Sequence, residues 1–298
     1  MFSIIIPLYN KESSIYKTIE SVIEQTFTRF ELLIIDDGST DTSINIVNSY
    51  NDSRIRIEKK ENGGAASARN LGINMSNYNW IAFLDADDIW KKNHLECLAF
   101  AINNYNDISI LTTATEQIIK KTVEINTFLF ESGFIGFIDD YFIKAKYNTI
   151  FNSSSTCLNK LCLDPDDRFD EELKFGEDLS LWFKILKKHK GFLYNIPTVL
   201  YDNNAHNRIM NTYCPYKKHL LYKINSFRNN DNSLNEFIDY FILRNSIPYY
   251  FSKENSNVIC NIFYSFNKST SFFYRLLYKK EFYFIIYPLY KMYKIIKK

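Results

Sequence analysis

Residues 80–90 read WIAFLDADDIW, an apolar run that ends in three aspartates within four positions. The apolar part is typical of a short buried strand. The carboxylates of Asp85, Asp87 and Asp88 repel one another, and a hard cation such as Mg²⁺ or Mn²⁺ would neutralise them and bridge to phosphate oxygens. Capping of the next helix by Asp88 is the structural alternative, but a cap needs only one acid. The pattern therefore predicts a divalent-metal site at the end of this strand.

The segments on either side of this stretch alternate between strand-like and helix-like patterns. Strands are predicted over residues 2–7, 30–35, 54–58, 80–84, 108–113 and 154–158, and helices over residues 12–26, 64–75, 91–104 and 177–188. This alternation predicts an α/β fold with a mostly parallel central sheet flanked by helices. Ligands bind such sheets beyond the carboxyl ends of the strands, where we expect Tyr9-Asn10, Asp36-Asp37 and the aspartates of residues 85–88.

The alternation is lost beyond about residue 210, and this divides the chain into two predicted regions. Residues 1–210 are expected to form the α/β domain, and residues 211–298 a helical region rich in Tyr, Phe, Asn and Lys. The composition is 46% hydrophobic, which is ample for a large core in a chain of 298 residues. The net charge of +2 gives no basic excess that would indicate nucleic-acid binding.

Leader sequences, membrane spans and cysteines bear on the compartment. The N-terminal MFSIIIPLYN lacks a basic start, and its apolar run is too short for a signal peptide. No stretch approaches the ~18 apolar residues of a membrane-spanning helix. The five cysteines have no zinc-site spacing and are expected to be free thiols. We therefore predict a cytoplasmic protein, with attachment to the inner face of the membrane left open.

Two loops hold candidate ligand-binding residues, each with a structural alternative. In the turn Asp36-Asp37-Gly38-Ser39, one acid can cap the following helix and the other can accept a hydrogen bond from a base or a ribose. The loop Asn62-Gly63-Gly64 runs into a helix whose N-terminus favours anions. Arg69, one turn into that helix, can pair with a diphosphate. A plain turn and helix cap is the alternative for this loop.

Acidic residues and a histidine further along the chain are weaker candidates when taken alone. Glu177 and Asp178 begin a predicted helix, where the helix dipole favours acids whatever their function. His206 is one of four histidines, and a lone histidine is more often structural than catalytic. These residues gain meaning only in combination with the other motifs.

Five motifs together resemble a known family. They are SIIIPLYN (3–10), FELLIIDDGSTD (30–41), NGGAASARNLG (62–72), WIAFLDADDIW (80–90) and FGEDLSLW (175–182). In this order and spacing, over roughly residues 2–206, the chain resembles family 2 glycosyltransferases with the GT-A fold, including enzymes of bacterial surface-polysaccharide synthesis. The resemblance implies an inverting transferase of the hexosyltransferase class. It would move a sugar from a nucleotide-sugar donor to a hydroxyl of a glycan or lipid-linked acceptor, with Mn²⁺ or Mg²⁺ as cofactor.

The resemblance also implies roles for the donor-binding residues. Pro7, Tyr9 and Asp37 would hold the nucleotide base, and a flat ring face beside an acceptor for the uracil N3–H suits UDP. Asp85 and Asp87 would form the Asp-x-Asp motif, with Asp87 the more direct metal ligand and Asp85 able to hold the ribose instead.

The remaining roles concern the diphosphate and the acceptor. Arg69 would lie near the diphosphate or the donor sugar. Asp178 would be the general base, with Glu177 the second candidate, and His206 would help to bind the metal or the diphosphate.

Two other functions remain as alternatives. A sugar nucleotidyltransferase would have a longer Gly-rich loop with Arg and Lys directly after the first strand, whereas this chain has Leu8-Tyr9-Asn10-Lys11-Glu12. A non-catalytic sugar-nucleotide binder or scaffold is the second alternative, and intact acids at Asp87 and Asp178 argue against it.

The last 27 residues, FFYRLLYKKEFYFIIYPLYKMYKIIKK from Phe272 onward, combine seven cations with a single acid, Glu281. Basic residues among aromatic and aliphatic ones are typical of an interfacial helix, which Pro288 would break or kink. We therefore expect peripheral contact with the membrane. Packing of this segment on the catalytic domain, or a contact between subunits of a homo-oligomer, is the alternative.

Overall fold

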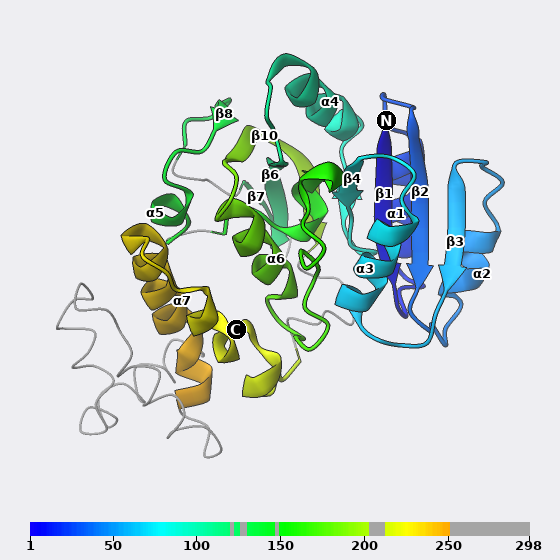
Figure 1. Cartoon of the computed structure of the whole chain (residues 1–298). Coiled ribbons are helices and arrows are strands. Elements are labelled where there is room, and N and C mark those ends of the chain that lie inside the picture. Colours follow the sequence, from blue (N-terminus) through cyan, green and yellow to red (C-terminus); the bar gives the residue numbers. More distant parts are fainter. Residues whose placement is uncertain (120–121, 126–129, 147–148, 203–211, 251–298) are drawn as a thin grey trace. The chain divides into compact units, whose positions relative to one another are not determined.

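The computed structural model describes residues 1–119, 122–125, 130–146, 149–202 and 212–250, and these fall into two compact units (Figure 1). The first unit takes in residues 1–141 and 148–214. The second takes in the segment that starts at Phe142 and the part of the chain from Pro215 onward. All the described candidate residues belong to the first unit.

A ten-stranded sheet forms the centre of the first unit, in the order β3-β2-β1-β4-β9-β6-β10-β5, with β7 paired to β6 and β8 to β10. The strands are β1 (Phe2–Leu8), β2 (Phe30–Asp36), β3 (Ile55–Lys59), β4 (Trp80–Phe83), β5 (Ile89–Trp90), β6 (Ile110–Ile119), β7 (Thr122–Ile125), β8 (Ile135–Phe137), β9 (Thr156–Asn159) and β10 (Gly191–Asp202). The helices are α1 (Ile15–Ile23), α2 (Ser43–Asn48), α3 (Ala65–Met75), α4 (His94–Asn104) and α6 (Glu177–Leu186), with 3-10 turns η1 (Ser153–Ser155) and η2 (Lys160–Cys162).

Helices cover both faces of β1, as the sequence predicts. Because side chains alternate along a strand, Ile4 and Ile6 point to one face and Ile5 to the other. Ile4 and Ile6 are buried in one core cluster with Ile15 and Ile19 of α1. On the other face, α3 approaches so closely that a Cβ at Gly72 would lie 2.6 Å from a methyl carbon of Ile5. The two helices therefore hold β1 rigidly, and with it the loop that follows Leu8.

The fold class is confirmed, and the sheet combines parallel pairs with antiparallel ones. Strands β3, β2, β1 and β4 pair in parallel, and β6 pairs in parallel with β10. Strand β9 runs antiparallel to both β4 and β6, and β5, β7 and β8 also form antiparallel pairs. Strand β10 was not predicted from the sequence. Asn195 and Pro197 interrupt its apolar pattern, and its register shifts on both sides of Pro197.

The second unit is helical in its described part. It contains α5 (Tyr141–Ala145, from Phe142 onward), three 3-10 turns and the long helix α7 (Asn232–Tyr250). The turns are η4 (Tyr216–Lys218), η5 (Leu220–Tyr222) and η6 (Ile224–Phe227). Arg228 pairs with Asp239, which is buried, and Phe142 packs on Phe237. Buried apolar side chains therefore give this unit a core of its own.

The described residues include four of the five cysteines. None of the helices in these residues combines the length and apolarity that a membrane crossing requires. Cys97, Cys157, Cys162 and Cys214 are free thiols, as the sequence predicts for them. Cys260 and the segment from Phe272 onward lie outside the described residues.

Candidate functional site

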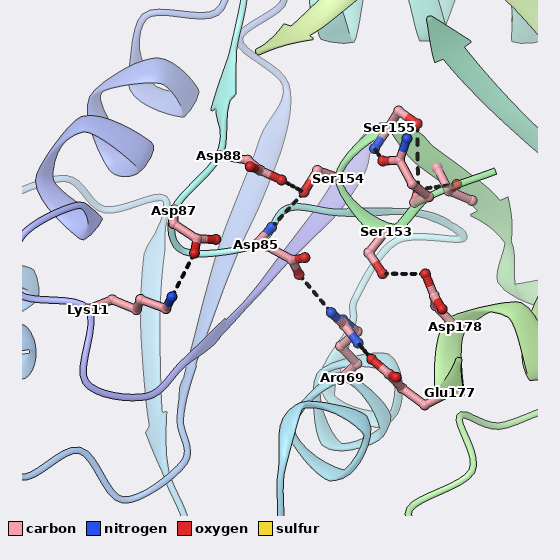
Figure 2. Close-up of polar contacts among 12 residues, drawn as sticks. Lys11, Arg69, Asp85, Asp87, Asp88, Ser153, Ser154, Ser155, Glu177 and Asp178 are labelled. Atoms are coloured by element: carbon pink, nitrogen blue, oxygen red, sulfur yellow. Dashed lines mark hydrogen bonds and ion pairs between the residues drawn. The ribbon is translucent and has the colours of Figure 1, made fainter. Parts of the chain in front are cut away.

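The acidic loop of residues 85–88 follows β4 and is fixed by two serines from distant segments, of which Figure 2 shows Ser154. Ser14 Oγ donates to the Ala86 carbonyl at 2.8 Å, just before α1 begins. Ser154 accepts a hydrogen bond from the Asp85 amide and donates to the buried Asp88 carboxylate. Capping by Asp88 is therefore wrong as an account of this residue, because α4 begins at His94 and its N-cap position is Asn93. Asp88 instead holds the acidic loop in place through the hydrogen bond that its carboxylate accepts from Ser154.

Asp87 forms an ion pair with Lys11, the third residue after β1. The Lys11 Nζ lies 2.6 Å from Asp87 Oδ2, and each side chain is 15% exposed. Figure 2 shows the lysine reaching across to the acidic loop from the neighbouring strand end. The Asp87 carboxylate can therefore take a cation at a position that solvent still reaches.

Arg69 on α3 connects the acidic loop to the start of α6. Its Nη2 lies 2.7 Å from Asp85 Oδ1 and its Nη1 lies 3.0 Å from Glu177 Oε1, while the side chain is only 4% exposed. The guanidinium also lies over the Phe169 ring, 5.3 Å from its centroid. Its buried Nε has no hydrogen-bond partner among the described residues. The positive charge of Arg69 thus balances the negative charges of Asp85 and Glu177, which belong to motifs far apart in the sequence.

Glu177 and Asp178 open α6, directly after Gly176, whose φ of 78° lies in the left-handed region that favours glycine. Ser153 Oγ lies 3.5 Å from Asp178 Oδ2. Burial and the neighbouring Glu177 raise the pKa of Asp178 to about 7, and Arg69 opposes that shift. A carboxyl group with this pKa can take up a proton near neutral pH, which is what a general base requires.

A second cluster surrounds Asp37 at the end of β2. Its buried carboxylate accepts hydrogen bonds from Lys60 Nζ at 2.6 Å and from the amides of Gly63 and Gly64 at 2.9 and 2.7 Å. The anion at the N-terminus of α3 is therefore Asp37 itself. Tyr9 is 47% exposed, so its ring remains open to a ligand.

Two neighbouring residues complete this strand edge. Pro7 is tolerated in the central strand β1 because the pairing with β4 ends at Ile5, before the missing amide would be needed. Neither Asp36 nor Asp37 caps α2, whose N-cap position is Thr42; Asp41, just before it, accepts from the amide of Ser43, the first residue of that helix. Asp36 instead holds the turn, through the Ser39 amide.

The described residues only partly define a metal site. Within the described residues, no three His, Cys, Asp or Glu side chains are grouped so that they could hold a metal ion. His206 lies outside the described residues. The donor chemistry nevertheless fits Mg²⁺ or Mn²⁺, because Asp87 already holds the ammonium of Lys11 at its carboxylate. Magnesium sites commonly use one or two carboxylates and complete their coordination with substrate phosphates and water.

Four residues of the two clusters are absent from the sequence prediction. Lys11 and Lys60 each neutralise a predicted aspartate, and Ser153 and Ser154 contact Asp178 and Asp88. The run of three serines at the start of a predicted strand is an available signal for the last two. The lysines carry no such signal, because their partners are fixed by strand order.

Comparison with known proteins identifies the family to which the chain belongs. The model of Glycosyl transferase family 2 matches residues 3–159, which is more than half of the chain. An uncharacterized glycosyltransferase of Rickettsia felis is 36% identical over 188 residues, covering 63% of this chain and 30% of that protein. The UDP-Glc:alpha-D-GlcNAc-diphosphoundecaprenol beta-1,3-glucosyltransferase WfgD of Escherichia coli is 33% identical over 193 residues, covering 63% of this chain and 70% of that protein. The matched segment thus spans less than a third of the Rickettsia relative.

A solved structure is also similar in fold. The crystal structure of residues 1–349 of S. aureus TarS in complex with UDP-GlcNAc superposes with a TM-score of 0.74 at 22% identity. The match covers 89% of this chain and 80% of that one. The fold of the chain is therefore the GT-A fold that the five motifs predict, and the chain belongs to glycosyl transferase family 2.

Proposed function

We propose that this chain transfers a sugar from a UDP-sugar to a hydroxyl of a glycan or lipid-linked acceptor, with inversion at the anomeric carbon. The observation that carries the proposal is the position of Arg69, which pairs with Asp85 of the acidic loop and with Glu177 at the start of α6. The side chain of Arg69 thereby links a donor-binding motif to a candidate base. The family and the fold support the same reaction class.

The donor would bind at the carboxyl edge of β1, β2 and β4. Exposed Tyr9 supplies a ring face for the base, with Pro7 beside it. The Asp37 carboxylate is buried, and a base N–H would have to use the second lone pair of Oδ2, which accepts from the Gly64 amide. The choice of UDP is supported by the UDP-sugar bound in TarS and by the UDP-Glc in the name of the E. coli relative. Asp85 would hold the ribose or join the metal site.

A divalent metal would be held by Asp87, with His206 as a further candidate ligand. When bound, Mg²⁺ or Mn²⁺ neutralises charge on the diphosphate as it leaves. Arg69 would add fixed positive charge on the same side of the site. The residues of this chain then need only orient the donor and remove one proton from the acceptor.

Asp178 would be that base. Its carboxylate takes the proton of the acceptor hydroxyl, while the hydroxyl oxygen bonds to the anomeric carbon. The bond from that carbon to the diphosphate oxygen breaks, and the electron pair leaves with the diphosphate. The raised pKa of Asp178 suits this task, because a base works best when its pKa lies near the operating pH. Glu177 is committed to Arg69, which favours Asp178 within the pair.

The proposed catalytic domain is residues 1–210, with residues 211–298 as a helical region. The diphosphoundecaprenol acceptor named for the E. coli relative supports a lipid-linked acceptor and a role in cell-surface polysaccharide synthesis. Such an acceptor would lie at the membrane, where the cationic and aromatic pattern from Phe272 onward would provide peripheral attachment.

Calorimetry of the purified chain with UDP, GDP and dTDP, each with manganese, tests the donor class. We expect UDP to bind at least about tenfold tighter than GDP, which corresponds to ~1.4 kcal/mol. Tighter binding of GDP would overturn the UDP assignment. Nucleotide release from UDP-sugars then separates a transferase from a non-catalytic binder, which would bind UDP without releasing it from the sugar.

A further inference from the structure

Each of the three aspartates assigned to the donor has a cation of this chain as partner. Asp37 pairs with Lys60, Asp85 with Arg69 and Asp87 with Lys11. Lys60 also donates to the backbone, and Arg69 is almost fully buried. Lys11 differs from both, because its ammonium lies on the carboxylate proposed for the metal and both side chains remain partly exposed.

The backbone of Lys11 is fixed, so its side chain starts from a defined point. Its amide donates to Ser43 Oγ at 2.8 Å, and its carbonyl accepts from the amides of Ser14 and Ile15. The preceding Asn10 has a φ of 49°, which turns the chain sharply after β1. The target is equally fixed, because Ser14 holds the acidic loop through the Ala86 carbonyl. The pair is therefore preorganised across the two loops.

A divalent cation and a lysine ammonium on one carboxylate repel each other. A metal can therefore occupy Asp87 fully only if the ammonium leaves Oδ2. A diphosphate brought in with the metal offers that ammonium new anionic oxygens, and lysine is a common phosphate-binding residue.

We propose that Lys11 occupies the metal-binding carboxylate of Asp87 in the empty enzyme and binds the donor diphosphate when the metal takes its place. The inference rests on the proposed function. Its consequence is coupled binding: the metal binds weakly alone and tightly with the nucleoside diphosphate. Because coupling between two ligands is reciprocal, UDP likewise binds tightly only with the metal.

The test is calorimetric titration of Mn²⁺ into the full chain, without and with saturating UDP, and of UDP into the full chain in saturating Mn²⁺. The wild type, Lys11→Met and Lys17→Met are compared. Lys17 is an exposed lysine of α1 and gives a matched control for loss of charge. We expect Lys11→Met to bind Mn²⁺ about tenfold tighter than the wild type when UDP is absent. Its affinity for UDP in saturating Mn²⁺ should fall by about tenfold. Lys17→Met should match the wild type in both.

The outcomes separate this inference from the proposed function. If the wild type binds Mn²⁺ with UDP but Lys11→Met matches it in both titrations, Lys11 has no such role and the proposed function stands. If the wild type binds UDP but no Mn²⁺ under either condition, the metal part of the proposed function fails, and the inference fails with it. Lys11→Arg keeps the charge and should retain weak Mn²⁺ binding without UDP; tight binding by this folded variant would also contradict the inference.

Discussion

Replacing Arg69 by Met tests whether the site is held together by charge. The substitution keeps much of the apolar volume but removes the cation that lies 2.7 Å from Asp85 and 3.0 Å from Glu177. Breaking a fully buried ion pair costs about 3–5 kcal/mol. Asp85 and Glu177 retain 30% and 15% exposure, so water screens part of the loss. We expect a loss of about 2–4 kcal/mol in the free energy of unfolding at pH 8.

This loss should depend on pH, with a sign fixed by Asp178. Its folded pKa of about 7 lies above the value of about 3.9 expected when unfolded. The stability it contributes is therefore present below pH ~4 and is lost as the pH rises through 7. Arg69 holds that pKa down, so removing it raises the folded pKa further. The variant should accordingly lose roughly 1 kcal/mol less at pH 5.5 than at pH 8.

Urea unfolding at pH 5.5, 7 and 8 gives the measurement, with Arg56→Met as the control. Arg56 pairs with Glu31 at 2.8 Å, but its side chain is 43% exposed, so its loss should cost at most about 1 kcal/mol. An equal loss for Arg69→Met at all three pH values would refute the electrostatic account, since it would point to packing alone. A loss no larger than that of Arg56→Met would refute it as well.

Three further predictions concern packing, metal binding and membrane contact. Gly72→Ala should destabilise the fold by about 1–3 kcal/mol, because its Cβ would overlap Ile5, and thermal unfolding would show this; a stabilised variant would contradict the close packing of α3 on β1. Asp87→Ala should abolish transfer while leaving the melting temperature within a few degrees of the wild type, since it removes a partly exposed carboxylate; near-normal turnover with manganese would contradict its role. A chain ending near Asn267 should sediment less with anionic liposomes than the full chain; equal sedimentation of both would rule out the C-terminal segment as the anchor.

The first strands and their acidic ends were predictable from the sequence because local patterns determine them. The apolar runs of β1 and β2 are continuous, and a change to polar residues marks the end of each. Helix α6 begins at Glu177 because Gly176 directly before it supplies a left-handed turn. Strand β10 was missed because Asn195 and Pro197 interrupt its pattern, although its neighbours β6 and β5 still pair with it.

The ion pairs of the site were beyond prediction for a different reason. Lys11 lies 76 positions from Asp87, and Arg69 lies 108 positions from Glu177. Lys11 meets Asp87 because strand order places the ends of β1 and β4 side by side, and Arg69 meets Glu177 because its side chain reaches from α3 to the first residue of α6. The sequence therefore identifies the acids of the site and Arg69, while the roles of Lys11 and Lys60 and the pairing of each cation with its acid require the fold.

In the proposed mechanism, Asp178 removes the acceptor proton as the sugar passes from a UDP-sugar to the acceptor. The most direct measurement compares Asp178→Asn with Glu177→Gln, using UDP binding by calorimetry and UDP release from the UDP-sugar with acceptor present. Asp178→Asn should bind UDP with wild-type affinity and turn over at least about 10²-fold more slowly. Glu177→Gln should lose less turnover, because its partner is Arg69. Near-normal turnover by Asp178→Asn, with Glu177→Gln inactive, would contradict the assignment of Asp178 as the base.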